Sequence, residues 1–197
     1  MSAGTSAGRR LILVGGGARS GKSAFALDYA RRLAAQQVDA PRPLFVATAQ
    51  AFDDEMRIRI DRHRDERGAI FDTTEEPLRL AAVIAAAESG RVVLVDCLTL
   101  WLSNLLLAEA PDGEILRQVT AVAEAAAGRA GPTLLVTNEV GLGLVPETAL
   151  GRRFRDLAGA AHQRLAAIAD EVYAALMGMV LRLHPGPMIS FRRGDLP

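Results

Sequence analysis

Residues 16–23 read Gly-Gly-Ala-Arg-Ser-Gly-Lys-Ser and fit the pattern Gly, four residues, Gly-Lys-Ser that binds nucleotide phosphates. Lys22 in this segment is the only lysine of the chain, because the other 22 of the 23 Lys and Arg positions are arginine. A compact ammonium group suits the role of a point charge between β- and γ-phosphates, for which the planar guanidinium group is too bulky. The segment therefore predicts a site for a nucleoside triphosphate. The predicted phosphate-binding residues are Gly16, Gly17, Ala18, Arg19, Ser20, Gly21, Lys22 and Ser23.

Two oxygen-bearing side chains are predicted to bind Mg²⁺ beside these phosphates. Ser23 directly follows the lysine, where the hydroxyl group of this loop pattern binds the ion. Asp96 follows the apolar run at residues 92–95, and an acid at such a strand end reaches the ion directly or through water. A switch GTPase is disfavoured, because its base-recognition pattern Asn-Lys-x-Asp needs a second lysine, which the chain does not have.

Residues 53–67 are a second informative segment, in which a histidine lies among arginines. At about 100° per residue, a helix would place Arg59, His63 and Arg67 on one face. The neighbouring cations disfavour a charged imidazolium, so the ring of His63 is expected to stay neutral and nucleophilic near pH 7. Such a site suits attack by nitrogen on phosphorus with formation of a covalent intermediate, while the arginines neutralise the phosphates.

Two other interpretations of this segment stay open. It can be a solvated helix with ion pairs such as Glu55–Arg59, four residues apart. It can also be an arginine-rich lid over a simple kinase site, with His63 only packing against the protein body.

The elements that must position these groups can be inferred from the hydrophobic pattern. Four runs are apolar throughout, which indicates strands buried on both faces of a parallel sheet. These runs are residues 11–14, 44–47, 92–95 and 134–136. Helical patterns cover residues 23–36, 53–67, 77–89, 99–108, 113–129 and about 149–169, and residues 171–183 can hold one or two more strands. This alternation predicts an α/β fold of the RecA-like P-loop NTPase type, a doubly wound, mainly parallel sheet with helices on both faces and with ligands at the carboxyl ends of its strands.

Composition narrows the class of protein further. Of 197 residues 50% are hydrophobic and 23% are charged, and the formal net charge is zero, so no general attraction to nucleic acid or membrane is expected. No apolar run approaches the roughly 20 residues that a membrane helix needs. The single cysteine, Cys97, excludes an internal disulfide and fits a reducing cytoplasm, and we expect it to be a buried residue at a strand end. The expected organisation is a disordered lead-in at 1–8, one nucleotide-binding catalytic domain at 9–184 and a tail of uncertain order at 185–197.

A set of short motifs runs in order from about residue 10 to residue 183. Besides the phosphate loop, its members are Ala47-Thr48-Ala49, Asp53-Asp54-Glu55-Met56, Arg59-Ile60, His63-Arg64, Val136-Thr137-Asn138-Glu139-Val140-Gly141, Phe154-Arg155-Asp156-Leu157-Ala158-Gly159, Gln163-Arg164-Leu165-Ala166 and Ala169-Asp170-Glu171-Val172. Taken together, these motifs resemble the family of bifunctional adenosylcobinamide kinases and adenosylcobinamide-phosphate guanylyltransferases of cobalamin biosynthesis. The combined set is far more specific than the phosphate loop alone, which many families share.

The resemblance implies one nucleotide pocket that serves two reactions. In the first, the γ-phosphate of ATP or GTP passes to a hydroxyl group of adenosylcobinamide, with Lys22 and Mg²⁺ stabilising the transferring group. In the second, His63 matches the family's guanylylated histidine. It would attack the α-phosphate of GTP, release pyrophosphate and pass GMP to adenosylcobinamide phosphate, which gives adenosyl-GDP-cobinamide. Members of the family form homo-oligomers, and a trimer is expected here.

The resemblance also implies nucleotide contacts outside the phosphate loop. By position these are Ala47, Thr48, Ala49, Arg64, Asp65, Glu66, Arg67, Glu75 and Asp96. The chain departs from the family pattern at four places: Phe71 replaces a usual Trp, Gly15 a usual Thr, His162 a usual Asn, and Arg62 the first member of a frequent His-His pair. His63 is therefore the one candidate nucleophile, and His162 is expected to have a structural role.

Two other functions stay open at this level. The first is a monofunctional small-molecule kinase without the transferase step, and the second is a P-loop protein that senses nucleotide without turnover. Formation of a protein adduct from GTP tests the first alternative, and nucleotide consumption that depends on cobinamide tests the second.

Overall fold

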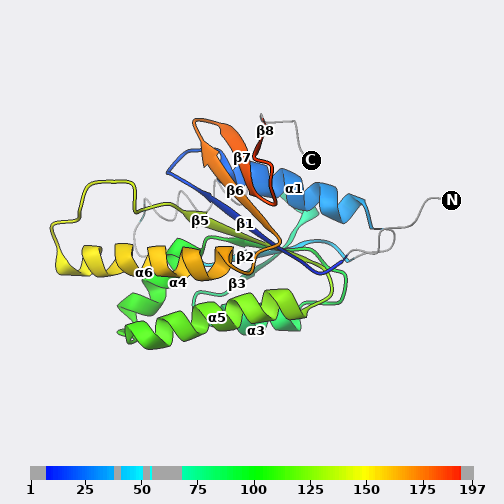
Figure 1. Ribbon diagram of the computed structural model, residues 1–197. Coiled ribbons are helices and arrows are strands. Elements are labelled where there is room, and N and C mark those ends of the chain that lie inside the picture. The colour runs from blue at the N-terminus through cyan, green and yellow to red at the C-terminus, as the bar shows by residue number, and fades with distance from the viewer. Residues whose placement is uncertain (1–7, 38–40, 51–53, 55–67, 192–197) are drawn as a thin grey trace.

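A computed structural model describes residues 8–37, 41–50, 54 and 68–191 of the chain. At its centre is an eight-stranded sheet with the order β3-β2-β4-β5-β1-β6-β7-β8 (Figure 1). The first six strands in this order are parallel, and β7 and β8 extend one edge in antiparallel fashion. The strands are β1 (Arg10–Gly16), β2 (Leu44–Ala47), β3 (Asp72–Glu75), β4 (Val93–Asp96), β5 (Pro132–Asn138), β6 (Glu171–Leu176), β7 (Met179–His184) and β8 (Ile189–Phe191).

Helices cover both faces of this sheet, as predicted (Figure 1). Helix α1 packs on one face through buried residues such as Phe25 and Leu33, and helices α3, α4, α5 and α6 pack on the other. The helices are α1 (Lys22–Ala35), α3 (Leu80–Ala86), α4 (Leu98–Leu107), α5 (Asp112–Gly128) and α6 (Ala149–Ala166), with a short 3₁₀ helix at Gly68–Ile70.

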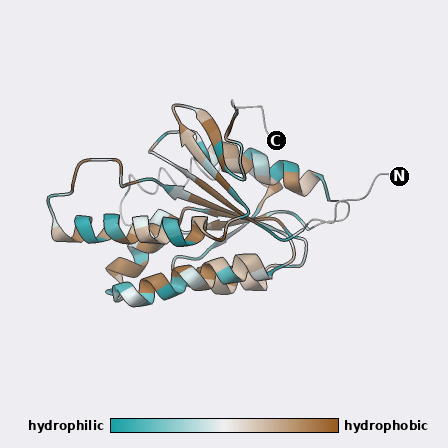
Figure 2. Ribbon diagram, viewed as in Figure 1, coloured by the Kyte–Doolittle hydropathy of each residue, from teal (hydrophilic) through white to brown (hydrophobic). Residues whose placement is uncertain are grey.

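The strand at the centre of the sheet shows why its sequence is apolar without alternation. Leu11 and Leu13 of β1 belong to the core formed with α3 to α6, whereas Ile12 and Val14 belong to the core formed with α1. Successive side chains of a strand point to opposite faces, so a strand covered on both sides buries every residue. Figure 2 accordingly shows the hydrophobic colour concentrated on the central strands.

The structure confirms most of the predicted elements. All four predicted strands are present, and α1, α4, α5 and α6 agree with their predicted ranges within a few residues. The helix predicted at 77–89 is shorter, because α3 spans Leu80–Ala86, and residues 171–183 hold two strands that turn at Gly178. Cys97 is buried directly after β4, as expected. The helix predicted at 53–67 lies outside the described residues, except for Asp54, which is helical.

Two strands are absent from the sequence-based prediction. Strand β3 reads Asp-Thr-Thr-Glu, and three of its four residues are exposed because it forms the edge of the sheet. A polar edge strand has no apolar run by which it could be recognised. Strand β8 lies within the stretch predicted as a tail and pairs with β7, while residues 192–197 are outside the described range. Within the described ranges, no helix combines the length and hydropathy needed to cross a membrane.

Candidate nucleotide-binding site

The predicted phosphate loop connects the carboxyl end of β1 to the first turn of α1. Strand β1 ends at Gly16 and α1 begins at Lys22. Between them the N–H group of Ser20 donates to the carbonyl oxygen of Gly17 at 3.3 Å, and both Arg19 and Gly21 have positive φ angles, 55° and 96°. The chain therefore passes through left-handed backbone before the helix begins. This geometry presents the free N–H groups of a helix N-terminus at the edge of the sheet, where they can bind an anion.

The ammonium group of Lys22 is buried inside this turn. Lys22 is only 7% exposed, and its Nζ donates to the carbonyl oxygen of Gly17 at 3.0 Å. Burial lowers the pKa of Lys22, while the charges of Asp96 and Cys97 act in the opposite direction. Among the described residues Gly17 is the one hydrogen-bond partner of this group. Since an ammonium group carries three donors, Lys22 can still donate to phosphate oxygens.

The turn between β6 and β7 supports the loop from one side. The N–H group of Gly178 in this turn donates to the carbonyl oxygen of Ser20 at 3.1 Å. Gly16 lies so close to β6 that an added Cβ would come within 2.5 Å of the Ala175 carbonyl oxygen and 2.6 Å of Ser20 Oγ. At Gly17 the same addition would meet nothing within 4 Å. The close packing therefore requires glycine at the first of these two positions and not at the second.

Asp96 lies at the same edge of the sheet as the loop. It is the last residue of β4, which is separated from β1 by β5 alone. In the parallel register Asp96 pairs with Ala47 of β2, and Ala47 pairs with Glu75 of β3. The structure thus brings Ala47, Glu75 and Asp96 together at the carboxyl edge, where the sequence predicts nucleotide contacts.

Thr48 holds the connection that follows Asp96. Its side chain is fully buried, and its Oγ1 both donates to the carbonyl oxygen of Cys97 at 2.7 Å and accepts from the N–H group of Cys97 at 2.9 Å. Its carbonyl oxygen accepts from Asn104 Nδ2 at 2.8 Å. Thr48 therefore positions the backbone next to Asp96, and its predicted contact with nucleotide stays a prediction.

Only some of the remaining predicted site residues belong to the described part of the chain. Ala49 is half-buried and lies two residues after the end of β2. The predicted nucleophile His63 lies outside the described residues, and so do the predicted nucleotide contacts Arg64, Asp65, Glu66 and Arg67. The roles predicted for them stay predictions.

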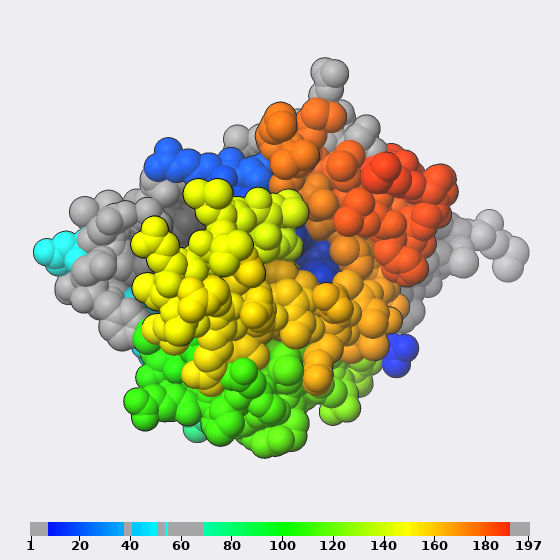
Figure 3. All heavy atoms as spheres, turned by 60° about the vertical axis from the view of Figure 1, so that its left-hand side comes forward, coloured from blue at the N-terminus to red at the C-terminus, as the bar shows by residue number. Residues whose placement is uncertain are grey.

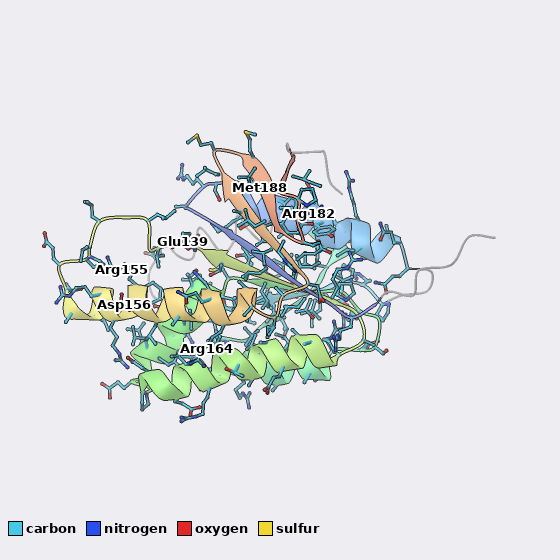
Figure 4. All side chains as sticks on the ribbon, in the orientation of Figure 1. Glu139, Arg155, Asp156, Arg164, Arg182 and Met188 are labelled. Carbon is cyan, nitrogen blue, oxygen red and sulfur yellow. The ribbon has the colours of Figure 1, made fainter. Side chains whose placement is uncertain are left out.

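A polar cluster at the end of β5 has no function in the sequence-based prediction. The N–H group of Glu139 donates to the carbonyl oxygen of Gly16 at 3.0 Å, so Glu139 directly adjoins the phosphate loop. Its Oε2 lies 3.6 Å from Nδ1 of His162 in α6, and Nε2 of that ring lies 2.7 Å from Thr137 Oγ1. Figure 4 shows Glu139 at this end of the sheet, on the side of α6. In the sequence two polar residues, Thr137 and Asn138, separate Glu139 from the apolar run at 134–136, so its place in the motif at residues 136–141 is the only signal for it.

The histidine of this cluster has a pKa below its usual value. Burial lowers the pKa of His162 from its usual 6.5, and the neighbouring carboxylate of Glu139 partly opposes this shift. The ring is therefore neutral at pH 7. Its contacts with Thr137 and Glu139 join α6 to β5, which agrees with the structural role expected for His162.

A mainly parallel sheet with this loop between β1 and α1 defines a P-loop nucleotide-binding protein. A crystal structure of the RadB recombinase shares the fold, with a TM-score of 0.51 and 17% identity over 94% of this chain and 88% of that one. The family model described as "Cobinamide kinase / cobinamide phosphate guanyltransferase" matches residues 12–183. The chain belongs to this family.

Curated relatives match almost their whole length. The "Bifunctional adenosylcobalamin biosynthesis protein CobP" of Pseudomonas aeruginosa is 47% identical over 184 residues, which cover 91% of this chain and 99% of that protein. The "Bifunctional adenosylcobalamin biosynthesis protein CobU" of Salmonella typhimurium is 40% identical over 190 residues, which cover 88% of this chain and 99% of that protein. The family resemblance inferred from the motifs is thereby confirmed.

The packing at Gly16 leads to a test of the loop. We expect Gly16→Ala to lower the free energy of unfolding by about 1–3 kcal/mol, because the new methyl group overlaps Ala175 and Ser20. Urea denaturation measures this change. Gly17→Ala is the matched control, and its stability should be unchanged or slightly higher. Equal stability of the two variants would show that the loop does not pack as described.

The lowered pKa of the half-buried His162 leads to a test by pH. Because the pKa of His162 is lowered from 6.5 in the folded chain, the unfolded chain takes up this proton first as the pH falls. The stability that the folded chain gains by keeping His162 neutral is therefore fully present above about pH 6.5, and it is lost as the pH falls below that value. We expect the free energy of unfolding to decrease less between about pH 7 and pH 5 in His162→Asn than in the wild type. Parallel curves for the two proteins would contradict this assignment.

Proposed function

We propose that this protein phosphorylates adenosylcobinamide with ATP or GTP and then transfers GMP from GTP to adenosylcobinamide phosphate. The names of its family and of its relatives state these two activities or the pathway to which they belong. The observation that carries the proposal is the folded phosphate loop within a chain that matches this family from residue 12 to residue 183. A buried ammonium group at the start of α1 is the feature that a triphosphate requires.

For the kinase step, the loop binds and orients the triphosphate. Its backbone N–H groups and Lys22 would donate to the phosphate oxygens and stabilise the charge of the transferring group. The packing of Gly16 against β6 and the hydrogen bond from Gly178 would keep the loop in place while the phosphates change. Preorganised donors of this kind lower the barrier because they need not reorganise during the reaction.

The predicted metal ligands fit Mg²⁺. Ser23 and Asp96 offer a hydroxyl and a carboxylate oxygen, the donor type that this ion prefers. In the part of the chain that the structure describes, there is no group of three or more His, Cys, Asp or Glu that could hold a metal ion. This agrees with an ion held by one or two protein oxygens, waters and the substrate phosphates. Once bound, Mg²⁺ would neutralise charge on the β- and γ-phosphates.

For the transferase step, we propose His63 as the nucleophile. The nitrogen of the ring would form a bond to the α-phosphorus of GTP, and pyrophosphate would leave with the electrons of the broken P–O bond. The phosphate group of adenosylcobinamide phosphate would then take the GMP from the histidine. Arg64, Asp65, Glu66 and Arg67 are proposed to contact the nucleotide from the same segment, together with Ala47, Ala49 and Glu75 at the sheet edge.

We further propose that the enzyme is a cytoplasmic homo-oligomer, with a trimer as the expected state. Its one cysteine, Cys97, agrees with a reducing compartment. Three apolar residues in the loop between β5 and α6 support the oligomer, since Leu142, Leu144 and Val145 are 89%, 95% and 63% exposed. Figure 3 shows this loop on the outer surface of the molecule. Grouped exposed apolar residues favour an interface with another chain.

The role of Lys22 can be tested by titration with triphosphate. We expect Lys22→Ala to lower the affinity for GTP about 10- to 100-fold in calorimetry, because hydrogen bonds from a charged donor are lost. Lys22→Arg keeps the charge, but it should not restore binding in so small a space. Arg117→Ala, on the exposed surface of α5, is the control for a lost cation. Wild-type affinity and turnover in Lys22→Ala would exclude the loop as the triphosphate site.

The role of His63 can be tested with GTP labelled at the α-phosphate. We expect the wild type to form an acid-labile, base-stable adduct, as a phosphorus–nitrogen bond does, and His63→Ala to form none. His184→Ala, in the exposed end of β7, should form the adduct as the wild type does. Absence of an adduct from an active wild-type kinase would leave the monofunctional alternative in place. Cobinamide-dependent consumption of nucleotide would exclude the sensor alternative.

A further inference from the structure

Glu139 and Lys22 bind to consecutive residues of the phosphate loop. The N–H group of Glu139 donates to the carbonyl oxygen of Gly16, and Nζ of Lys22 donates to that of Gly17, both at 3.0 Å. Consecutive Cα atoms are about 3.8 Å apart, so the backbone of Glu139 lies within roughly 10 Å of the ammonium group. A glutamate side chain can therefore reach the surroundings of a phosphate that Lys22 binds.

The carboxylate of Glu139 has the accessibility and hydrogen bonding of a proton acceptor. Its side chain is 38% exposed, and one oxygen, Oε1, accepts the N–H group of Gly141 at 2.6 Å. The other oxygen, Oε2, lies 3.6 Å from the neutral ring of His162. Among the described residues, no lysine or arginine pairs with this carboxylate. Oε2 can thus accept a proton from a substrate.

Glu139 and the start of α1 belong to opposite faces of the sheet. Helix α1 packs on the face that contains Val136, whereas Thr137 contacts His162 of α6 on the other face. The contact of Glu139 with the same His162 places its carboxylate on the α6 side (Figure 4). In phosphoryl transfer the attacking and leaving oxygens lie roughly in line on opposite sides of phosphorus. When a nucleotide is bound at the start of α1, the incoming hydroxyl group can therefore approach the γ-phosphorus from the α6 side.

We propose that Glu139 is the general base of the kinase step and accepts the proton of the cobinamide hydroxyl group. The hydroxyl oxygen forms a bond to the γ-phosphorus, and the bond from this phosphorus to the bridging oxygen breaks. The nucleoside diphosphate leaves with that electron pair, and the proton passes to Oε2 of Glu139. This inference rests on the proposed kinase function and adds to it the residue that activates the acceptor.

His162 is the positioning residue of this pair. Its Nε2 is 2.7 Å from the hydroxyl group of Thr137, which can donate to it, so that Nδ1 carries the hydrogen and faces Glu139. The ring then orients the carboxylate without reaching the substrate. An asparagine at this position keeps an N–H donor directed at Glu139, and a leucine does not.

The two reactions of the enzyme differ in their need for a base. A hydroxyl group must lose a proton when it attacks phosphorus, whereas the phosphate group that accepts GMP is already an anion. Removal of the base should therefore impair the first reaction and spare the second. This difference also separates a general base from a residue that only shapes the loop, since loss of the loop would impair both reactions.

The test compares the two reactions in Glu139→Gln, which keeps the size of the side chain and an acceptor for Gly141. We expect kcat of adenosylcobinamide phosphorylation to fall about 100-fold or more. Formation of the protein adduct from α-labelled GTP, and transfer of GMP to supplied adenosylcobinamide phosphate, should stay within about twofold of the wild type. The adduct also reports that the variant is folded. Glu147→Gln, an exposed glutamate of the same loop, is the matched control and should leave both reactions unchanged.

The histidine variants complete the test. We expect His162→Leu to lower kcat of the kinase step about tenfold with KM unchanged, and His162→Asn to stay within about threefold of the wild type. A kinase rate close to the wild type in Glu139→Gln would overturn the proposal, and so would an equal loss of both reactions. A wild type that does not phosphorylate cobinamide at all would instead refute the proposed function, and this inference with it.

Discussion

The rest of the site depends on one buried charge, the ammonium group of Lys22. Removing an ammonium group from water is unfavourable, and the lowered pKa of Lys22 records that cost. In the described structure the charge is compensated by one backbone carbonyl, that of Gly17, and by the more distant carboxylate of Asp96. Such a group binds an anion strongly because much of its hydration has already been lost. We propose that the phosphates of a nucleoside triphosphate are the anions that this ammonium group binds.

The parallel register of the sheet determines which residues lie at the same edge as this ammonium group. Because β2, β4, β5 and β1 run in the same direction, their carboxyl ends bring Ala47, Asp96, Glu139 and Gly16 to one edge. The β6–β7 turn then packs on the phosphate loop from the other side, through Ala175 and Gly178. The loop is thus held by strands on both sides, while α1 and α6 occupy opposite faces. A nucleotide and an acceptor can approach such an edge from different sides.

The sequence predicts those elements of the structure that are determined by residues close together in the chain. The phosphate loop, the four strands buried on both faces and most helices follow from residue type and spacing alone. Strand β3 could not be predicted, because its polar residues form a strand only through pairing with β2. The same limit applies to Thr48, whose hydroxyl group holds a residue 49 positions away. Glu139 is separated from its apolar run by two polar residues, and its neighbour His162 is brought to it by the packing of α6, which no local pattern contains.

The proposal of one pocket for two reactions requires that the phosphate loop bind the triphosphate before either bond is made. A crystal structure with a non-hydrolysable GTP analogue and Mg²⁺ tests this claim most directly. We expect Nζ of Lys22 to bind oxygens of the β- and γ-phosphates at about 2.8 Å, with the loop still packed on Ala175. Nζ remaining only on the carbonyl oxygen of Gly17, with the phosphates bound elsewhere, would contradict it.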